Sequence, residues 1–187
     1  MASLASPYPR LLSATEFLRI DFGSHLKAEL DDGVIRMMGG GSIAHARVQM
    51  NLYRTLASAL RGSGCRPYGS DAAVETHDRS VRYPDVTIDC ARGGDLPGDL
   101  VLREPRVIIE VLSPSTRTED AGVKLVEYRA LATVETIVLV DPDAERCRVV
   151  QRTGPGAWSD VTHSEPADIA FPSLGISIPH DEIFARD

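Results

Sequence analysis

A single carboxylate interrupts an apolar stretch in the middle of the chain. Glu110 follows Val-Ile-Ile at 107–109 and precedes Val111 and Leu112. Apolar runs of this kind are typical of strands that are covered on both faces. An ionised carboxylate in such a strand costs several kcal/mol unless it is paired or bound to a metal. We therefore expect Glu110 to hold a cation. In the alternative interpretation it lies at an exposed strand end and pairs with Arg106.

A second carboxylate, Asp85, is placed to act together with Glu110. Pro84 is tolerated at the first position of a strand, and Asp85 then points away from that strand's apolar face. Two carboxylates on adjacent strands can share one divalent cation, because Mg²⁺ binds a few carboxylates together with water and substrate phosphates. Asp89 lies on the same face and is the second choice. Its alternative role is that of a solvent-facing acid near the strand end.

Three polar side chains recur every four residues after the Glu110 strand. Asp120, Lys124 and Tyr128 share one face of a predicted helix, so Lys124 can complete a site of two carboxylates and one cation. The alternative is a surface ion pair between Asp120 and Lys124, with Tyr128 packing over it. Such a pair contributes only a few tenths of a kcal/mol.

The elements that must position these residues are mostly strands. Ahead of Asp85 the pattern predicts a short helix at 15–20, a hairpin with strands at 27–30 and 34–38 around Asp31-Asp32-Gly33, and a helix at 43–60 capped by Ser42. Extended segments are expected at 66–76, 81–90 and 106–112, and a capping box at 116–119 begins a helix at about 118–131. Further strands are predicted at 136–141, 146–152, 158–162 and 174–178. The strand–helix–strand unit 106–141 predicts an α/β fold with a mixed sheet and helices packed against it.

The charge of the chain is unevenly distributed. Its 187 residues include 20 Lys+Arg and 27 Asp+Glu, for a net charge of −7, which argues against a protein that coats polyanions generally. Residues 36–66, however, contain five arginines and no acid. This stretch predicts a surface on which Arg47, Arg54 and Arg61 hold a nucleic-acid backbone. Alternatively it is a solvated helix face whose acidic partners lie on neighbouring elements.

Length and composition predict one domain over residues 1–187, with 1–14 as a loose leader. Because the chain has neither an apolar run of roughly 18 residues nor a signal peptide, we expect a cytoplasmic protein that does not associate with membranes. The three cysteines, at 65, 90 and 147, have no metal-ligand spacing and are expected to be reduced, mostly buried thiols.

The candidate residues stand in motifs that resemble a known family. Pro84-Asp85, the segment 109–116 (Ile-Glu-Val-Leu-Ser-Pro-Ser-Thr), the Asp120/Lys124/Tyr128 triplet and Val140-Asp141-Pro142 are similar to the Uma-type family, described as "putative restriction endonucleases", of the PD-(D/E)XK nuclease superfamily. The hairpin at 29–33, the glycine turn before His45 and the segment 171–184 match as well. The resemblance implies a restriction-endonuclease-like core in which a mixed β-sheet is flanked by helices, with an extra N-terminal hairpin and C-terminal strands.

The resemblance also implies a site for Mg²⁺ or Mn²⁺ made by Asp85, Glu110 and the backbone carbonyl of Val111. The superfamily's lysine normally stands two residues after the glutamate, where this chain has Leu112. Lys124 is therefore interpreted as its migrated equivalent, which would orient the attacking water or neutralise charge on the scissile phosphate.

Further residues occupy family positions around this site. Glu29 either approaches the metal or pairs with an arginine. His45 is either a base or a capping and packing residue, and Gln49, one helical turn later, is a candidate substrate contact. The segment 133–137, Thr-Val-Glu-Thr-Ile, lacks the aromatic residues of the family, which affects substrate or partner contacts more than the metal site.

These implications predict a Mg²⁺-dependent endonuclease that hydrolyses phosphodiester bonds in DNA. The alternative hypothesis is a catalytically silent nuclease-fold module for nucleic-acid binding or protein assembly. The displaced lysine and the acidic total charge support this alternative. Nucleases of this fold often pair to cut two strands, so a homodimer is expected by analogy.

Overall fold

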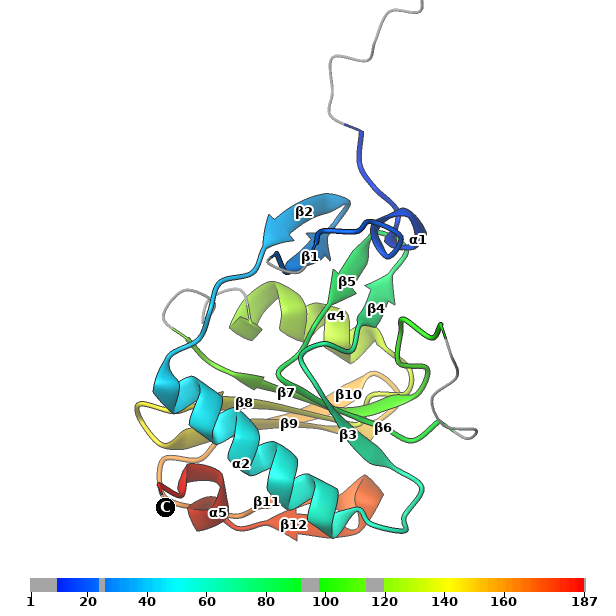
Figure 1. Ribbon diagram of the computed structural model, residues 1–187. Helices are drawn as coiled ribbons and strands as arrows, with labels where there is room; N and C mark the ends of the chain where they lie inside the picture. Colours follow the sequence, from blue (N-terminus) through cyan, green and yellow to red (C-terminus); the bar gives the residue numbers. More distant parts are fainter. Residues whose placement is uncertain (1–9, 24–25, 92–97, 114–119, 187) are drawn as a thin grey trace, which may run out of the picture.

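Strands that are apolar over most of their length build a six-stranded mixed sheet, which lies at the centre of a computed structural model of the protein (Figure 1). The structure describes residues 10–23, 26–91, 98–113 and 120–186. The strand order is β10-β9-β8-β7-β6-β3. The strands are β3 (Arg66–Gly69), β6 (Val86–Asp89), β7 (Pro105–Val111), β8 (Thr136–Asp141), β9 (Arg146–Gly154) and β10 (Ala157–Thr162). β7 and β8 run parallel and the other neighbours in this sheet run antiparallel, as predicted for a mixed sheet.

A helical connection explains the one parallel pair. The chain leaves β7, forms a π-helical turn (Asp120–Lys124) and α4 (Leu125–Ala130), and returns as β8. α4 covers one face of the sheet, where Leu125 and Tyr128 pack with Ile108 and Ile137. This confirms the predicted strand–helix–strand unit. The predicted capping box at 116–119 lies outside the described residues.

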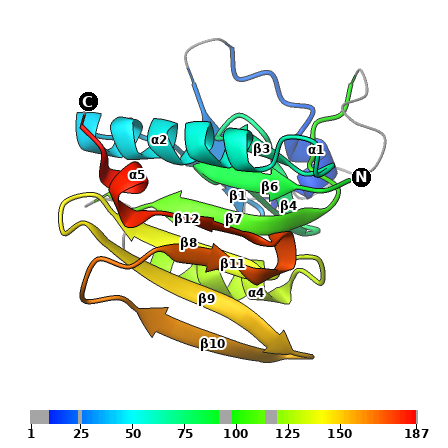
Figure 2. The same ribbon diagram turned by 90° about the horizontal axis from the view of Figure 1, so that it is seen from below.

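The opposite face of the sheet is covered by α2 (Ile43–Ala59), as Figure 2 shows from below. Ser42 caps this helix by accepting a hydrogen bond from the His45 backbone N–H, as expected for an N-cap serine. Leu52 and Leu56 are buried against the alternate β7 residues, which include Ile109. A hairpin of β11 (Ile169–Phe171) and β12 (Ile176–Ile178), followed by α5 (His180–Phe184), completes this layer. The sequence did not predict β11.

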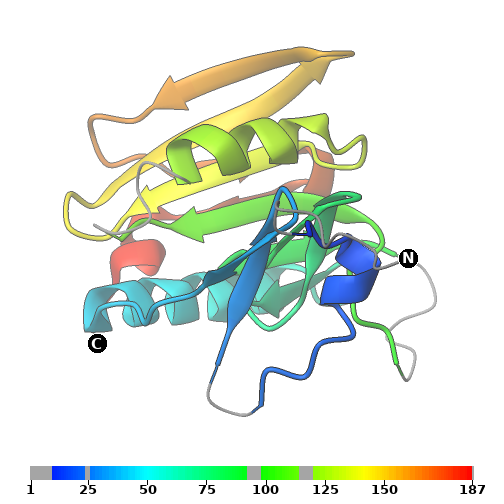
Figure 3. The same ribbon diagram turned by 90° about the horizontal axis from the view of Figure 1, so that it is seen from above.

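A second, four-stranded sheet stands on the α4 side of the molecule (Figure 3). Its order is β2-β1-β5-β4, with strands β1 (Ala28–Asp31), β2 (Val34–Met37), β4 (Val74–His77) and β5 (Ser80–Arg82). The β1–β2 turn has positive φ at both Asp32 (42°) and Gly33 (85°), the conformation that Asp-Gly favours in two-residue hairpins. α1 (Ala14–Phe17) packs beside this sheet.

Two sequence expectations are corrected by this arrangement. The extended segments 66–76 and 81–90 are each divided between the two sheets, giving β3 and β4 from the first and β5 and β6 from the second. The end of the predicted loose leader is also ordered. The Leu12 N–H donates to the Gly33 carbonyl at 2.9 Å, and Ser13 forms a capping box with Glu16 at the start of α1.

The cysteine expectation is wrong for two of the three residues. Cys65 and Cys90 form a disulfide. β3 pairs antiparallel with β6 so that Arg66 lies opposite Asp89, and this register brings the two flanking cysteines together. Cys147 is buried and free, as expected, and burial raises the pKa of its thiol to about 12. No helix in the described part of the chain combines the length and apolar content needed to cross a membrane.

Candidate active site

Glu110 is buried in β7, with 4% of its surface exposed. Its neighbours Ile109 and Val111 face α2, so alternation turns Glu110 toward α4. There the Tyr128 hydroxyl donates to Glu110 Oε1 at 2.6 Å, and Lys124 Nζ lies 3.5 Å from the same oxygen. The alternative partner is ruled out, because Arg106 pairs with Glu135.

Asp85 lies immediately before β6 and beside Glu110. The β6–β7 register pairs Val86 with Ile109, and one further step in the same register places Asp85 opposite Glu110. The Val111 N–H donates to Asp85 Oδ2 at 2.7 Å. The predicted pair of carboxylates on adjacent strands is therefore present in the structure.

Two residues of α2 hold Asp85 from the other side. His45 Nε2 lies 3.0 Å from Asp85 Oδ1, and Gln49 Nε2 donates to the Asp85 carbonyl at 2.9 Å. A Cβ on Gly41 would come within 2.7 Å of the His45 ring, so this position needs glycine for the ring to reach Asp85. The structure therefore brings His45 and Gln49 together with the candidate carboxylates, and both make their contact through Asp85.

Asp89, the second choice for a metal ligand, lies away from this group. Its carboxylate accepts the Ala91 N–H at 2.7 Å and the Glu104 N–H at 2.8 Å. It thus organises the loops that follow β6 and precede β7, and it is neither a metal ligand with Glu110 nor a solvent-facing acid.

Lys124 is 6% exposed, at the point where the π-helical turn passes into α4. Its Nζ lies 3.1 Å from Glu29 Oε1 as well as 3.5 Å from Glu110. A surface ion pair is therefore the wrong interpretation for Lys124. Asp120 begins the same turn, and its side chain lies outside the described part of the structure.

Glu29 makes both an arginine contact and a site contact. Its Oε2 lies 3.5 Å from Arg82, and its Oε1 accepts the Tyr83 N–H at 3.1 Å in addition to its contact with Lys124. The sequence left open whether Glu29 pairs with an arginine or enters the site. The structure combines the arginine pair with a contact to the site lysine.

The surroundings of Tyr128 keep its hydroxyl protonated, so that it can donate a hydrogen bond to Glu110. Complete burial raises the pKa of Tyr128 well above its ordinary value, and the negative charge of Glu110 raises it further. The hydroxyl therefore stays protonated at neutral pH and stabilises the ionised form of Glu110.

Asp85, Glu110 and Lys124 meet at a cavity of about 410 Å³ between the small sheet, α2 and the end of β7. Its lining includes the site residues and the glycine turn that leads into α2: Gly39, Gly40, Gly41, His45, Gln49, Asp85, Glu110, Val111 and Lys124. Asp85 and Glu110 offer the hard oxygen donors that Mg²⁺ and Mn²⁺ prefer. Within the described ranges no group of three or more His, Cys, Asp or Glu is arranged to hold a metal. A metal here would therefore be held by the carboxylates of Asp85 and Glu110, with water or backbone oxygens completing its coordination.

The predicted backbone-binding arginines do not line this cavity. Arg47 donates to the carbonyls of Phe184 and Ala185, both at 2.6 Å, and Arg54 pairs with Glu182. These two guanidinium groups hold the C-terminal α5 against α2, and the role of these arginines on a nucleic-acid backbone stays a prediction. Arg61 is exposed beyond the far end of α2, away from the carboxylates.

Sequence reasoning missed Arg82, which is completely buried next to the site. A signal for it exists in the sequence, since Arg82 stands between Val81 and Tyr83 in a predicted strand, just before Pro84-Asp85. A cation in an apolar strand requires anionic partners for the same reason that Glu110 requires a cation.

Comparison with known proteins shows what the chain as a whole is similar to. The family model "Uma2: Putative restriction endonuclease" matches residues 14–179. A relative from Synechocystis sp., "Uncharacterized protein slr1290", is 27% identical over 183 residues, covering 97% of this chain and 95% of the relative. A second Synechocystis protein, "Uncharacterized protein sll1609", is 26% identical over 80% of this chain and 85% of its own length.

A solved structure has the same fold. The crystal structure of a "putative nuclease belonging to DUF820" from Anabaena variabilis matches with a TM-score of 0.75. The match covers 93% of this chain and 98% of the Anabaena chain. The two chains share 19% sequence identity.

Proposed function

The chain belongs to the Uma2 family, and we propose that it is a metal-dependent endonuclease that hydrolyses phosphodiester bonds in DNA. Family membership and a nuclease-type fold support a nuclease-like role. The choice of DNA as substrate, the dependence on Mg²⁺ or Mn²⁺ and the residue roles are parts of the proposal.

The observation that carries the proposal is the meeting of Asp85, Glu110 and Lys124 at one cavity. A buried carboxylate next to a second carboxylate is costly in an ordinary core, because like charges in a poorly hydrated site repel each other. The arrangement becomes favourable when a divalent cation is bound. When bound, the metal would polarise a phosphoryl oxygen and lower the pKa of a coordinated water.

The protein's own residues prepare the site for that chemistry. The Val111 N–H and His45 fix the two oxygens of Asp85, while Gln49 fixes its backbone. Tyr128 holds Glu110 in one orientation. Lys124 supplies a buried ammonium beside Glu110, which would oppose the negative charge that builds on a phosphate during hydrolysis.

The test is cleavage of plasmid and single-stranded DNA with Mg²⁺, with Mn²⁺ and with a chelator. We expect Asp85→Asn and Glu110→Gln to lower the cleavage rate on the order of 100-fold or more, since each removes a charged ligand. Asp143→Asn and Glu75→Gln are matched controls, because both residues are exposed and remote from the cavity. They should cut like the wild type.

Two results would contradict the proposal. Cleavage by folded Asp85→Asn and Glu110→Gln at the wild-type rate would exclude these carboxylates from catalysis. DNA binding by the wild type without cleavage, and without Mn²⁺ binding in calorimetry, would instead favour the catalytically silent module.

A further inference from the structure

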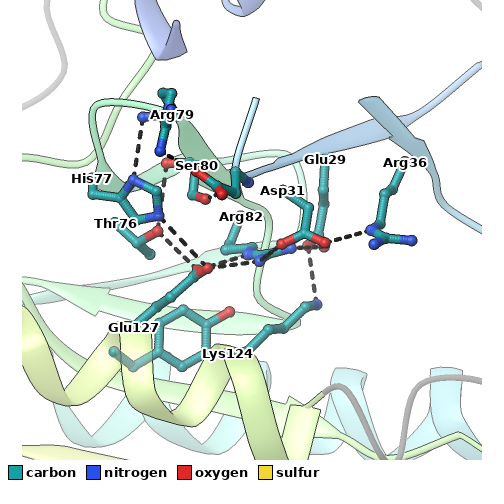
Figure 4. Close-up of polar contacts among 12 residues, drawn as sticks. Glu29, Asp31, Arg36, Thr76, His77, Arg79, Ser80, Arg82, Lys124 and Glu127 are labelled. Atoms are coloured by element: carbon teal, nitrogen blue, oxygen red, sulfur yellow. Dashed lines mark hydrogen bonds and ion pairs between the residues drawn. The ribbon is translucent and has the colours of Figure 1, made fainter. Parts of the chain in front are cut away.

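Arg82 lies at the centre of a buried cluster of charges that joins the small sheet to α4 (Figure 4). Its guanidinium contacts three carboxylates: Glu29 at 3.5 Å, Asp31 at 2.7 Å and Glu127 at 2.8 Å. Two of them come from β1 and the third from α4. Arg82 therefore connects two elements that are distant in sequence and that both contribute to the site.

The contact with α4 has two hydrogen bonds. Arg82 Nε donates to Glu127 Oε2 and its Nη2 donates to Oε1, both at 2.8 Å. Such a paired arrangement fixes orientation as well as distance. Glu127 stands one helical turn after Lys124 and next to Tyr128. Holding Glu127 thus holds the helix that carries both side chains in contact with Glu110.

The contact between Arg82 and Glu29 helps to position the Lys124 ammonium, because Glu29 also contacts Lys124. A lysine side chain is a flexible four-carbon stem, so its ammonium needs contacts of its own to stay in one place. Glu29 can provide them because its carboxylate is fixed by Arg82 on Oε2 and by the Tyr83 N–H on Oε1. The same Oε1 accepts from Lys124 Nζ at 3.1 Å.

The charge of Lys124 lies between the Arg82 cluster and Glu110. In the described part of the chain the cluster contains three permanent cations, Arg36, Arg82 and Lys124, and three carboxylates, Glu29, Asp31 and Glu127. Lys124 lies closer to Glu29 than to Glu110. The charge of Lys124 is therefore shared between these two carboxylates.

We propose that Arg82 and Glu29 are positioning residues that hold the Lys124 ammonium beside Glu110, and that Glu29 does not bind the metal. This inference rests on the proposed nuclease function for its catalytic consequence. It goes beyond that function by assigning a role to the small sheet, which supplies none of the proposed metal ligands.

The first experiment separates positioning from metal binding. Glu29→Gln keeps an oxygen that can accept from Tyr83 and Lys124 but removes the charge. We expect kcat to fall about tenfold, with KM and the Kd for Mn²⁺ each within about threefold of the wild type. Asp85→Asn provides the contrast, with a large loss of Mn²⁺ affinity. Glu75→Gln on neighbouring β4 is the matched control and should change none of these values.

The second experiment needs neither metal nor substrate. The ammonium ¹⁵N–¹H NMR signal of Lys124, assigned by its absence in Lys124→Arg, should be resolved in the metal-free wild type because the group is buried and held. We expect Glu29→Gln to broaden or remove it. Glu127→Gln should shift the signal indirectly, because the described contacts of Glu127 are with Thr76, His77 and Arg82 and not with Lys124. Thermal unfolding confirms that each variant is folded.

The outcomes are distinct. A loss of Mn²⁺ affinity in Glu29→Gln equal to that in Asp85→Asn would make Glu29 a metal ligand and overturn the inference. An unchanged Lys124 signal in folded Glu29→Gln, together with an unchanged kcat, would overturn it as well. If the wild type neither binds Mn²⁺ nor cleaves DNA, the proposed function fails, and the NMR signal still decides whether Glu29 holds Lys124.

Discussion

The two sheets of this protein combine apolar burial and buried charge in different proportions. The six-stranded sheet buries apolar side chains on both faces, with Ile109 among those toward α2 and Ile108 among those toward α4. In the four-stranded sheet, β2 is exposed along its whole length and β5 buries Ser80 and Arg82 on either side of Val81. The large sheet depends on apolar burial on both faces. The small sheet has a smaller apolar cluster that Leu30 and Val81 form with Phe17 of α1, and it adds the buried guanidinium of Arg82 and its carboxylates.

The two sheets also contribute different residues to the candidate site. The large sheet supplies Glu110, and Asp85 precedes one of its strands, so the carboxylates are placed by a rigid apolar scaffold. The small sheet supplies Glu29, which acts on the lysine. The large sheet therefore positions the two carboxylates, and the small sheet positions the Lys124 ammonium. Substitutions in the two sheets should have different effects.

The largest effect is expected from removing the charge at the centre of the small sheet. Arg82→Met keeps most of the volume but leaves Glu29, Asp31 and Glu127 without their shared partner. We expect a loss of about 3–5 kcal/mol in the free energy of unfolding at pH 7, measured by urea denaturation. The loss should shrink at acid pH, because protonation of the three carboxylates removes their repulsion.

A matched change in the large sheet sharpens the comparison. Ile137→Val on β8 removes one buried methylene and should cost about 1 kcal/mol, with no dependence on pH. If Arg82→Met costs no more than Ile137→Val, and equally at every pH, the small sheet does not depend on the charges of this cluster.

Much of the fold follows from the sequence because its signals are local. Asp31-Asp32-Gly33 specifies a hairpin by turn chemistry, and Ser42 with the periodicity of 43–60 specifies α2. The division of 66–76 and 81–90 between two sheets has no local signal. Both segments contain strand-forming residues throughout, and the choice of sheet depends on partners such as β1 and β7.

The same distinction applies to the site. Glu110 could be identified because an acid inside an apolar run has few physical explanations, and its partner Asp85 follows from strand alternation. The environment of Arg82 could not be derived, since its partners Glu29, Asp31 and Glu127 lie 53, 51 and 45 positions away in the chain. Pairing over such distances is set by the tertiary structure.

A smaller effect is expected at the edge of the large sheet. The Cys65–Cys90 disulfide joins residues 25 positions apart and closes the β3–β6 pair. Cys65→Ser should lower the free energy of unfolding by about 2–4 kcal/mol, because the bond restricts the unfolded chain. A reductant should destabilise the wild type and leave Cys65→Ser unchanged. Titration of three free thiols in the unfolded, unreduced wild type would show that the bond does not form.

The smallest effect is a pH dependence confined to the small sheet. Burial opposes ionisation of Asp31, but hydrogen bonds from Arg36 and Arg82 prevail and lower its pKa below the ordinary 3.8. A lowered folded-state pKa gives stability that is present above 3.8 and is lost as the pH falls through the folded value.

Asp31→Asn should therefore be less stable than the wild type by about 1 kcal/mol at pH 6, and the gap should close toward pH 2 in urea unfolding. Asp32→Asn, in the exposed turn next to it, removes only a surface pair with Arg79 and should show a smaller gap. A gap for Asp31→Asn that persists undiminished at pH 2 would mean that the carboxylate contributes through its shape and packing. The small sheet would then resemble the large one in what stabilises it, and the contrast between them would rest on Arg82 alone.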